Sequence, residues 1–177
     1  RRVEEAVKRI KEILERVTRR VEKVLRDNKR VLDDIRRINE EMLKRNKEIN
    51  RKVEELVREG RPRKVIKDLL KRSRESVEES ERLNRDLLRK SEETVRRALK
   101  EIEDALKRIE ELVREVERES DVEKIKEILE EVRRTIEELK ERIRKSLEEV
   151  KELIKRMDEE NRKSLEESDE RARRAEK

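Results

Sequence analysis

The chain has 177 residues, of which 59 % are Lys, Arg, Asp or Glu and 31 % are apolar, and it contains no Phe, Trp, Tyr, Cys, His or Gln. Enzymes and cofactor-binding proteins normally need His, Cys or aromatic side chains, so this composition excludes most known catalytic, metal and cofactor sites. The formal charge of +6 comes from 55 positive and 49 negative residues that are closely interspersed, without aromatics for base stacking, so we expect no nucleic-acid partner.

The first third of the chain repeats its apolar and Asn positions with the period of a straight α-helix, about 3.6 residues. Such a charged chain could otherwise be disordered, but this period predicts a helix with almost no supercoil. The repeating positions are Val3, Val7, Ile10, Leu14, Val17, Val21, Val24, Asn28, Leu32, Ile35, Asn39, Met42, Asn46, Asn50, Val53 and Val57.

Two breaks divide the chain into three helices. Gly60 followed by Pro62 is typical of a helix end and a new helix start across a tight turn. Ser120 precedes Glu123 by three residues, which indicates a capping box at the start of the last helix. We therefore expect helices over about 2–59, 62–117 and 121–175, each about 80 Å long at the helical rise.

Loops this short place neighbouring helices antiparallel. The predicted fold class is therefore all-α: an antiparallel, up-down-up three-helix bundle of long, nearly straight helices, with residues 1–177 forming a single bundle. On a helical wheel each helix has one apolar arc of roughly 160°, enough for two neighbours, and no second apolar stripe for a bilayer or another subunit. No apolar run approaches the ~18 residues of a membrane span. We expect a soluble monomer that requires no partner.

The polar residues inside these arcs carry the most information. All six Asn and seven of the eight Ser lie there, whereas Lys, Arg, Asp and Glu cover the outside. This partition predicts buried hydrogen-bond networks, because a buried amide or hydroxyl needs a partner. The predicted network residues are Asn28, Asn39, Asn46, Asn50, Asn84, Asn161, Ser73, Ser76, Ser80, Ser91, Ser146, Ser164 and Ser168.

Aligning the three helices through their short loops predicts which of these side chains meet. Asn28 is expected beside Ser91 and Ser146, and Asn46 beside Ser73 and Ser164. Asn39 is expected beside Ser80, and Asn161 beside Ser76 near Leu43. A polar layer of this kind penalises a wrong register more than it stabilises the right one.

Four features of the chain resemble de novo designed helical bundles with buried hydrogen-bond networks. They are the missing residue types, the repeat of 18 residues in five helical turns, the minimal loops and the Asn/Ser layers. The resemblance extends over the whole chain. It implies a synthetic scaffold, switch or interaction module, soluble on recombinant expression, and it implies no catalytic residues, no metal and no cofactor.

Two other groups of residues are not expected to form functional sites. Ser with Lys is not expected to form a hydrolytic dyad, because the Ser face inward and the Lys outward. The acidic pairs Asp33–Asp34 and Glu159–Glu160 are typical of solvated helix surface, with a Lys or Arg near every acid.

Two functional hypotheses remain beside a remote third. The first is a structural scaffold without biochemical activity. The second is an interaction module, by self-association or by binding an additional helix along the polar residues that crowd into the half of the bundle near Gly60. The third is a natural three-helix coiled coil associated with membrane or cytoskeleton, although such folds usually carry aromatic residues and broken repeats.

Overall fold

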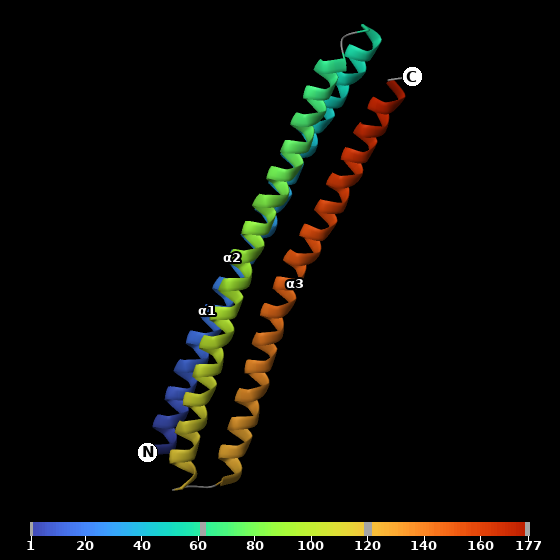
Figure 1. The fold of residues 1–177 in the computed structure, drawn as a ribbon. Coiled ribbons are helices and arrows are strands. Elements are labelled where there is room, and N and C mark those ends of the chain that lie inside the picture. The colour runs from blue at the N-terminus through green and yellow to red at the C-terminus, as the bar shows by residue number, and fades with distance from the viewer. Residues whose placement is uncertain (1, 61–62, 119–121, 176–177) are drawn as a thin grey trace. The chain divides into compact units, whose positions relative to one another are not determined.

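The computed structural model describes residues 2–60, 63–118 and 122–175, and within them the chain is a three-helix bundle without strands. The helices are α1 (Arg2–Arg58), α2 (Arg63–Glu117) and α3 (Val122–Ala175). Figure 1 shows them as three continuous coiled ribbons, running from blue in α1 to red at the end of α3. The predicted all-α fold class is confirmed.

Gly60 ends α1 in the manner that its sequence position predicts. Its φ is +66°, a left-handed conformation that glycine adopts without a steric penalty. The amide of Gly60 donates to the Val57 carbonyl at 3.2 Å, and that of Glu59 donates to the Glu55 carbonyl at 3.0 Å, which satisfies two carbonyls of the last turn. Pro62 and Ser120 lie outside the described residues. Glu123 lies in the first turn of α3, where its negative carboxylate interacts favourably with the positive end of the helix dipole.

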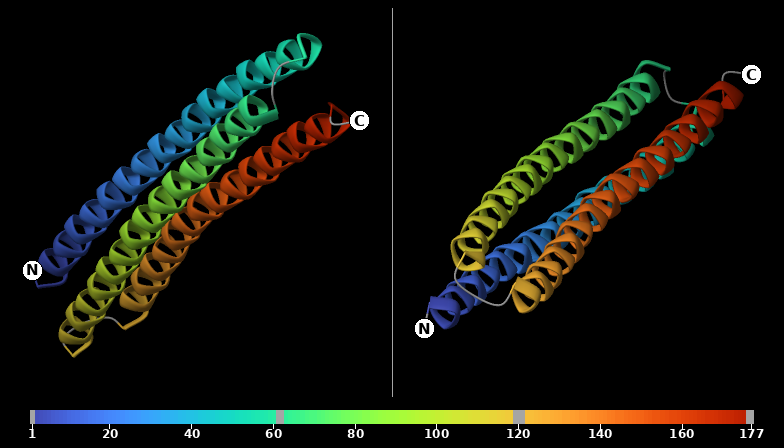
Figure 2. Two further views of the ribbon diagram at one scale, coloured as in Figure 1. Left: turned by 45° about the horizontal axis from the view of Figure 1, so that its top comes forward. Right: turned by 90° about the horizontal axis from the view of Figure 1, so that it is seen from below.

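The contacts between helices group the chain into two compact units, and each unit takes one segment from each helix. Unit 1 consists of residues 1–29 and 90–149, and unit 2 consists of residues 30–89 and 150–177. Figure 2 shows these segments from two further sides. The single bundle predicted over residues 1–177 remains a prediction.

Unit 1 has an almost wholly apolar interior. In its α2–α3 pair, Lys140 lies near Glu103 and Arg133 near Glu110, so higher numbers on α3 face lower numbers on α2 and the two segments are antiparallel. The fully buried side chains Ile102, Ile109, Ile136 and Ile143 come from these two segments. The core also takes Ala6, Ile10, Ile13, Val17, Val21 and Val24 from α1.

Unit 2 has a smaller apolar cluster and a more polar interior. Its cluster of buried apolar side chains contains Ile35 on α1 and Val150, Leu153 and Ile154 on α3. The remaining interior positions are largely occupied by asparagine and serine. The interior of unit 1 is therefore mainly apolar, whereas the interior of unit 2 combines a small apolar cluster with hydrogen-bonded polar side chains.

Candidate functional site

The polar layer of unit 1 is a chain of two hydrogen bonds centred on Asn28. The Ser91 hydroxyl of α2 donates to Asn28 Oδ1 at 2.5 Å, and Asn28 Nδ2 donates to the Ser146 hydroxyl of α3 at 3.1 Å. Asn28 and Ser91 are buried and Ser146 is half-buried. One asparagine thus connects all three helical segments of the unit, and the pairs are those that the sequence register predicts.

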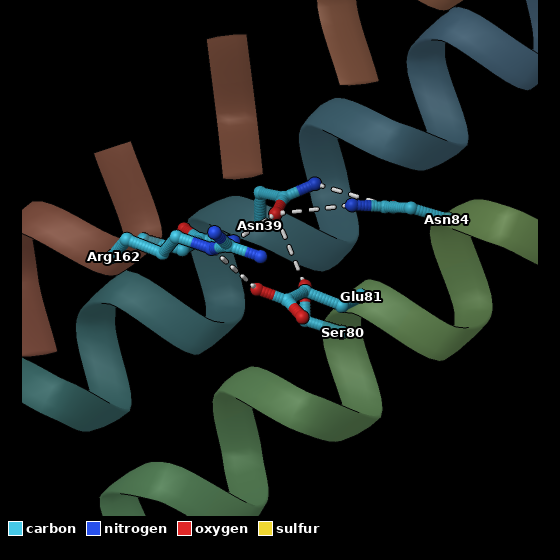
Figure 3. Close-up of polar contacts among 6 residues, drawn as sticks. Asn39, Ser80, Glu81, Asn84 and Arg162 are labelled. Carbon is cyan, nitrogen blue, oxygen red and sulfur yellow. Dashed lines mark hydrogen bonds and ion pairs between the residues drawn. The ribbon is translucent and has the colours of Figure 1, made fainter. Parts of the chain in front are cut away.

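The largest polar cluster lies in unit 2 and centres on Asn39 (Figure 3). Asn39 Oδ1 accepts from Ser80 Oγ at 3.0 Å, Asn84 Nδ2 at 3.4 Å and Asn161 Nδ2 at 2.8 Å. Asn39 Nδ2 donates to the Ile35 carbonyl at 2.6 Å and to Asn84 Oδ1 at 3.3 Å. One carbonyl oxygen is therefore the shared acceptor for donors from both other helices.

The Asn39 cluster leaves two acceptors without a donor. Among the described residues, the buried atoms Asp158 Oδ1 and Asn161 Oδ1 have no hydrogen-bond partner. Both belong to α3, three residues apart, and therefore lie on the same face of that helix. On its α3 side, the Asn39 cluster thus has more accepting oxygens than donors.

A second layer of unit 2 joins Asn46 of α1 to Ser73 of α2. The Ser73 hydroxyl donates to Asn46 Oδ1 at 3.0 Å, and Asn46 Nδ2 contacts the Met42 sulfur at 3.1 Å within its own helix. Among the described residues no hydrogen bond joins Asn46 to Ser164, which was expected beside it, because the Asn46 amide donates to the Met42 sulfur. Ser164 is half-buried, and its carbonyl accepts from the Ser168 hydroxyl at 2.9 Å.

A third layer joins Asn50 of α1 to Ser168 of α3. The Ser168 hydroxyl donates to Asn50 Oδ1 at 2.7 Å. Ser168 is buried and Asn50 is half-buried. This layer connects two helices, because within the described residues Asn50 has no polar partner from α2.

Among the described residues no hydrogen bond joins Asn161 to Ser76, which was also expected beside it. Asn161 reaches one helical turn along α1, past Leu43, and donates to Asn39 instead. The Leu43 side chain has no polar atom, whereas the side-chain carbonyl of Asn39 is a strong acceptor for the buried Asn161 amide. Ser76 is half-buried and makes no side-chain hydrogen bond among the described residues.

Two charged side chains in or beside the interior were not predicted. Lys140 in unit 1 has only 9 % of its surface exposed, with Glu137 at 3.8 Å and Glu103 at 3.9 Å from its ammonium nitrogen. Asp158 in unit 2 is half-buried beside the Asn39 cluster. Neither residue breaks the charge pattern of the sequence, because each long helix carries an acid or a base at nearly every turn.

Burial raises the pKa of the Asp158 carboxyl above its ordinary value of 3.8, and the nearby carboxylate of Glu81 raises it further. A hydrogen bond with the Asn84 side chain and the positive charges of Arg162 and Arg85 lower the pKa, but they do not cancel the increase. Glu81 itself lies 3.7 Å from Arg162 (Figure 3), so the charge of this arginine acts on both Glu81 and Asp158.

The raised pKa predicts that Asp158 destabilises the fold at neutral pH. A carboxyl whose folded pKa lies above its unfolded value binds its proton more tightly in the folded state. The stabilisation of the fold that comes from this tighter proton binding is therefore complete below pH 3.8. It is lost as the pH rises through the folded pKa. We expect Asp158→Asn to raise the free energy of unfolding, with a gain that grows from pH 3 to pH 7.

Urea unfolding at several pH values measures this gain, and Glu159→Gln on the exposed neighbouring position is the matched control. A stability difference between Asp158→Asn and the parent that does not change with pH would contradict the prediction.

Within the described residues, no group of three or more acidic side chains is placed to hold a metal ion. Asp34 lies 3.3 Å from Arg37 and Asp33 lies 4.0 Å from Arg36, so this acidic pair is matched by neighbouring arginines. In the same residues, no helix is both long and apolar enough to span a membrane.

No protein-family model matches the chain, and no curated protein matches its sequence. Among solved structures, one described as "Computationally designed three helix bundle" is similar. It is 18 % identical, the alignment covers 97 % of this chain and 86 % of that one, and the TM-score is 0.38. The function of the chain is therefore inferred from its own side chains.

Proposed function

We propose that the chain is a de novo designed structural scaffold without natural biochemical activity, whose interior hydrogen bonds specify the register and topology of its helices. One observation carries the proposal: each of the six asparagines hydrogen-bonds a side chain of another helix. Asparagine is found mostly on protein surfaces, so six asparagines that all bond between helices indicate that these positions were chosen for those bonds.

The energetics of buried polar groups explain how such bonds specify a register. A buried hydrogen bond contributes about 1 kcal/mol net, whereas a buried group left without a partner costs about 1 to 3 kcal/mol. A slip of one helix by a few residues would keep most apolar contacts but separate Asn28 from Ser91 and Asn46 from Ser73. The polar layers therefore act mainly by destabilising the wrong arrangements.

The burial of these side chains favours a scaffold over an exposed docking face. In unit 2, Asn39, Asn84 and Asn161 are fully buried, and Asn46 and Ser73 are 1 % exposed. Apart from Asn161 Oδ1, which has no hydrogen-bond partner, their buried side-chain donors and acceptors bond within the unit and are covered from solvent. An additional helix would have to open the unit before it could bond to them. The proposed scaffold accordingly requires no partner, nucleic acid or membrane.

The experiment that tests this proposal compares two variants of unit 2. In the first, Asn46→Ala removes the acceptor of the buried Ser73 hydroxyl, and we expect the free energy of unfolding to fall by about 1 to 3 kcal/mol. In the second, every buried asparagine and serine of unit 2 is replaced by an apolar residue of similar volume. We expect this variant to be as stable as the parent or more stable.

The second variant is expected to lose its unique structure. Light scattering should detect larger or mixed species, and amide NMR spectra should show more than one set of signals, because apolar layers with an 18-residue repeat accept several registers. The control replaces Asn28, Ser91 and Ser146 alone, which leaves the unit 2 layers intact. A single monomeric species with one set of signals from the fully apolar variant would overturn the proposal.

A further inference from the structure

A groove of about 490 Å³ lies between α1 and α2 within unit 1. Its apolar wall is formed by Ile13 and Val17 of α1 and by Ile102 and Ala105 of α2. Ala105 is half-buried, and its side chain is a single methyl group, whereas Ile102 and Ile109 one helical turn away are larger. A volume of this size is in the range of small-molecule sites in proteins, about 300 to 1,000 Å³.

The rim of the groove is predominantly positive. Five basic side chains line it, against the two acids Glu101 and Asp104. The basic side chains are Arg16, Arg19, Arg20, Lys23 and Arg108. Arg20 is bonded to Glu101 at 2.9 Å. Arg16, Lys23 and Arg108 have no ion-pair partner within 4.0 Å among the described residues, so their charges are open to an added anion.

We propose that this groove binds a medium-chain fatty carboxylate, with its alkyl chain on the wall formed by Ile13, Val17, Ile102 and Ala105 and its carboxylate beside the basic side chains of the rim. The apolar wall would add nothing to the binding of a purely ionic ligand such as inorganic phosphate, so it favours an anion that carries an alkyl chain. The excess of positive charge selects an anionic head over a neutral or cationic one.

The groove is shorter than a helical partner would need. It extends along α1 from Ile13 to Lys23, about 15 Å at the helical rise, which is three turns. Long Arg and Lys side chains line the groove together with the apolar residues, and their alkyl stems can cover an alkyl chain while their charged ends stay in water. These dimensions fit a single flexible chain rather than a packed helix.

The probe is decanoate, added below its micelle concentration and followed by calorimetry and by amide shifts of residues 13–23 and 101–108. We expect saturable binding, and weaker binding of the neutral analogue decanol. Ala105→Leu fills the groove and should weaken decanoate binding by about tenfold or more. Lys107→Leu adds the same side chain at an exposed position of α2 and should leave binding unchanged.

A charge series keeps the proposal testable if Ala105→Leu disturbs folding. Arg16, Lys23 and Arg108 are exposed, so replacing all three by Gln should preserve the fold while weakening decanoate binding. The same replacement at Lys11, Arg97 and Lys100 removes equal charge from exposed positions of unit 1 outside the groove. Absence of saturable binding, equal binding in both charge variants, or equal binding by a folded Ala105→Leu variant would overturn the proposal.

Discussion

Asn39→Ala is expected to lower the free energy of unfolding by at least about 3 kcal/mol, because it removes the shared acceptor of three buried donors. Ser80, Asn84 and Asn161 each lose a hydrogen bond to Asn39 Oδ1. All are buried, so water cannot replace that acceptor without entering the unit. The void left by the shorter side chain adds to the loss.

Chemical denaturation of the variant measures this effect, and Asn50→Ala provides the matched control. Asn50 is half-buried and accepts a single bond from Ser168, so its replacement should cost about 1 kcal/mol. A loss for Asn39→Ala that does not exceed the loss for Asn50→Ala would show that the donors around Asn39 find other partners.

Ile136→Ala is expected to destabilise unit 1 by about 2 to 5 kcal/mol, the usual cost of shortening a buried isoleucine. The Ile136 side chain is fully buried in the apolar core of that unit. The loss has two parts: the apolar surface no longer buried and the cavity that remains. Ile136→Val removes one methylene and should cost only about 0.5 to 1.5 kcal/mol.

Thermal and chemical unfolding of these two variants test whether the unit 1 core is tightly packed. The same substitutions at the half-buried Ile128 should have smaller effects. Equal losses for Ile136→Ala and Ile128→Ala would contradict a core in which complete burial decides the cost.

The helices and their ends could be predicted from the order of the residues alone. The period of the apolar positions, the single Gly60 and the break after Glu117 predict α1, α2 and α3 to within a residue or two of the observed bounds. Helix formation and termination depend on side chains a few residues apart, so the information is local and can be read along the chain.

The sequence also determined which asparagines and serines share a level. The pairs Asn28 with Ser91, Asn46 with Ser73, and Asn39 with Ser80 follow from the helical rise once two short loops align the helices. A constant rise carries that alignment along neighbouring helices, so a level many turns from the loop can be calculated.

The atoms that bond within a level and between adjacent levels could not be predicted, because they depend on how the helices pack. Asn161 reaches Asn39 rather than Ser76, and the Asn46 amide turns to Met42 rather than Ser164. The rise and the rotation of a helix place each Cα, but not the rotamer of the side chain. A long amide takes whichever acceptor its neighbours leave available, and that choice depends on side chains of all the helices around it. For the same reason the burial of Lys140, the raised pKa of Asp158 and the groove beside Ala105 appear only when the helices are packed.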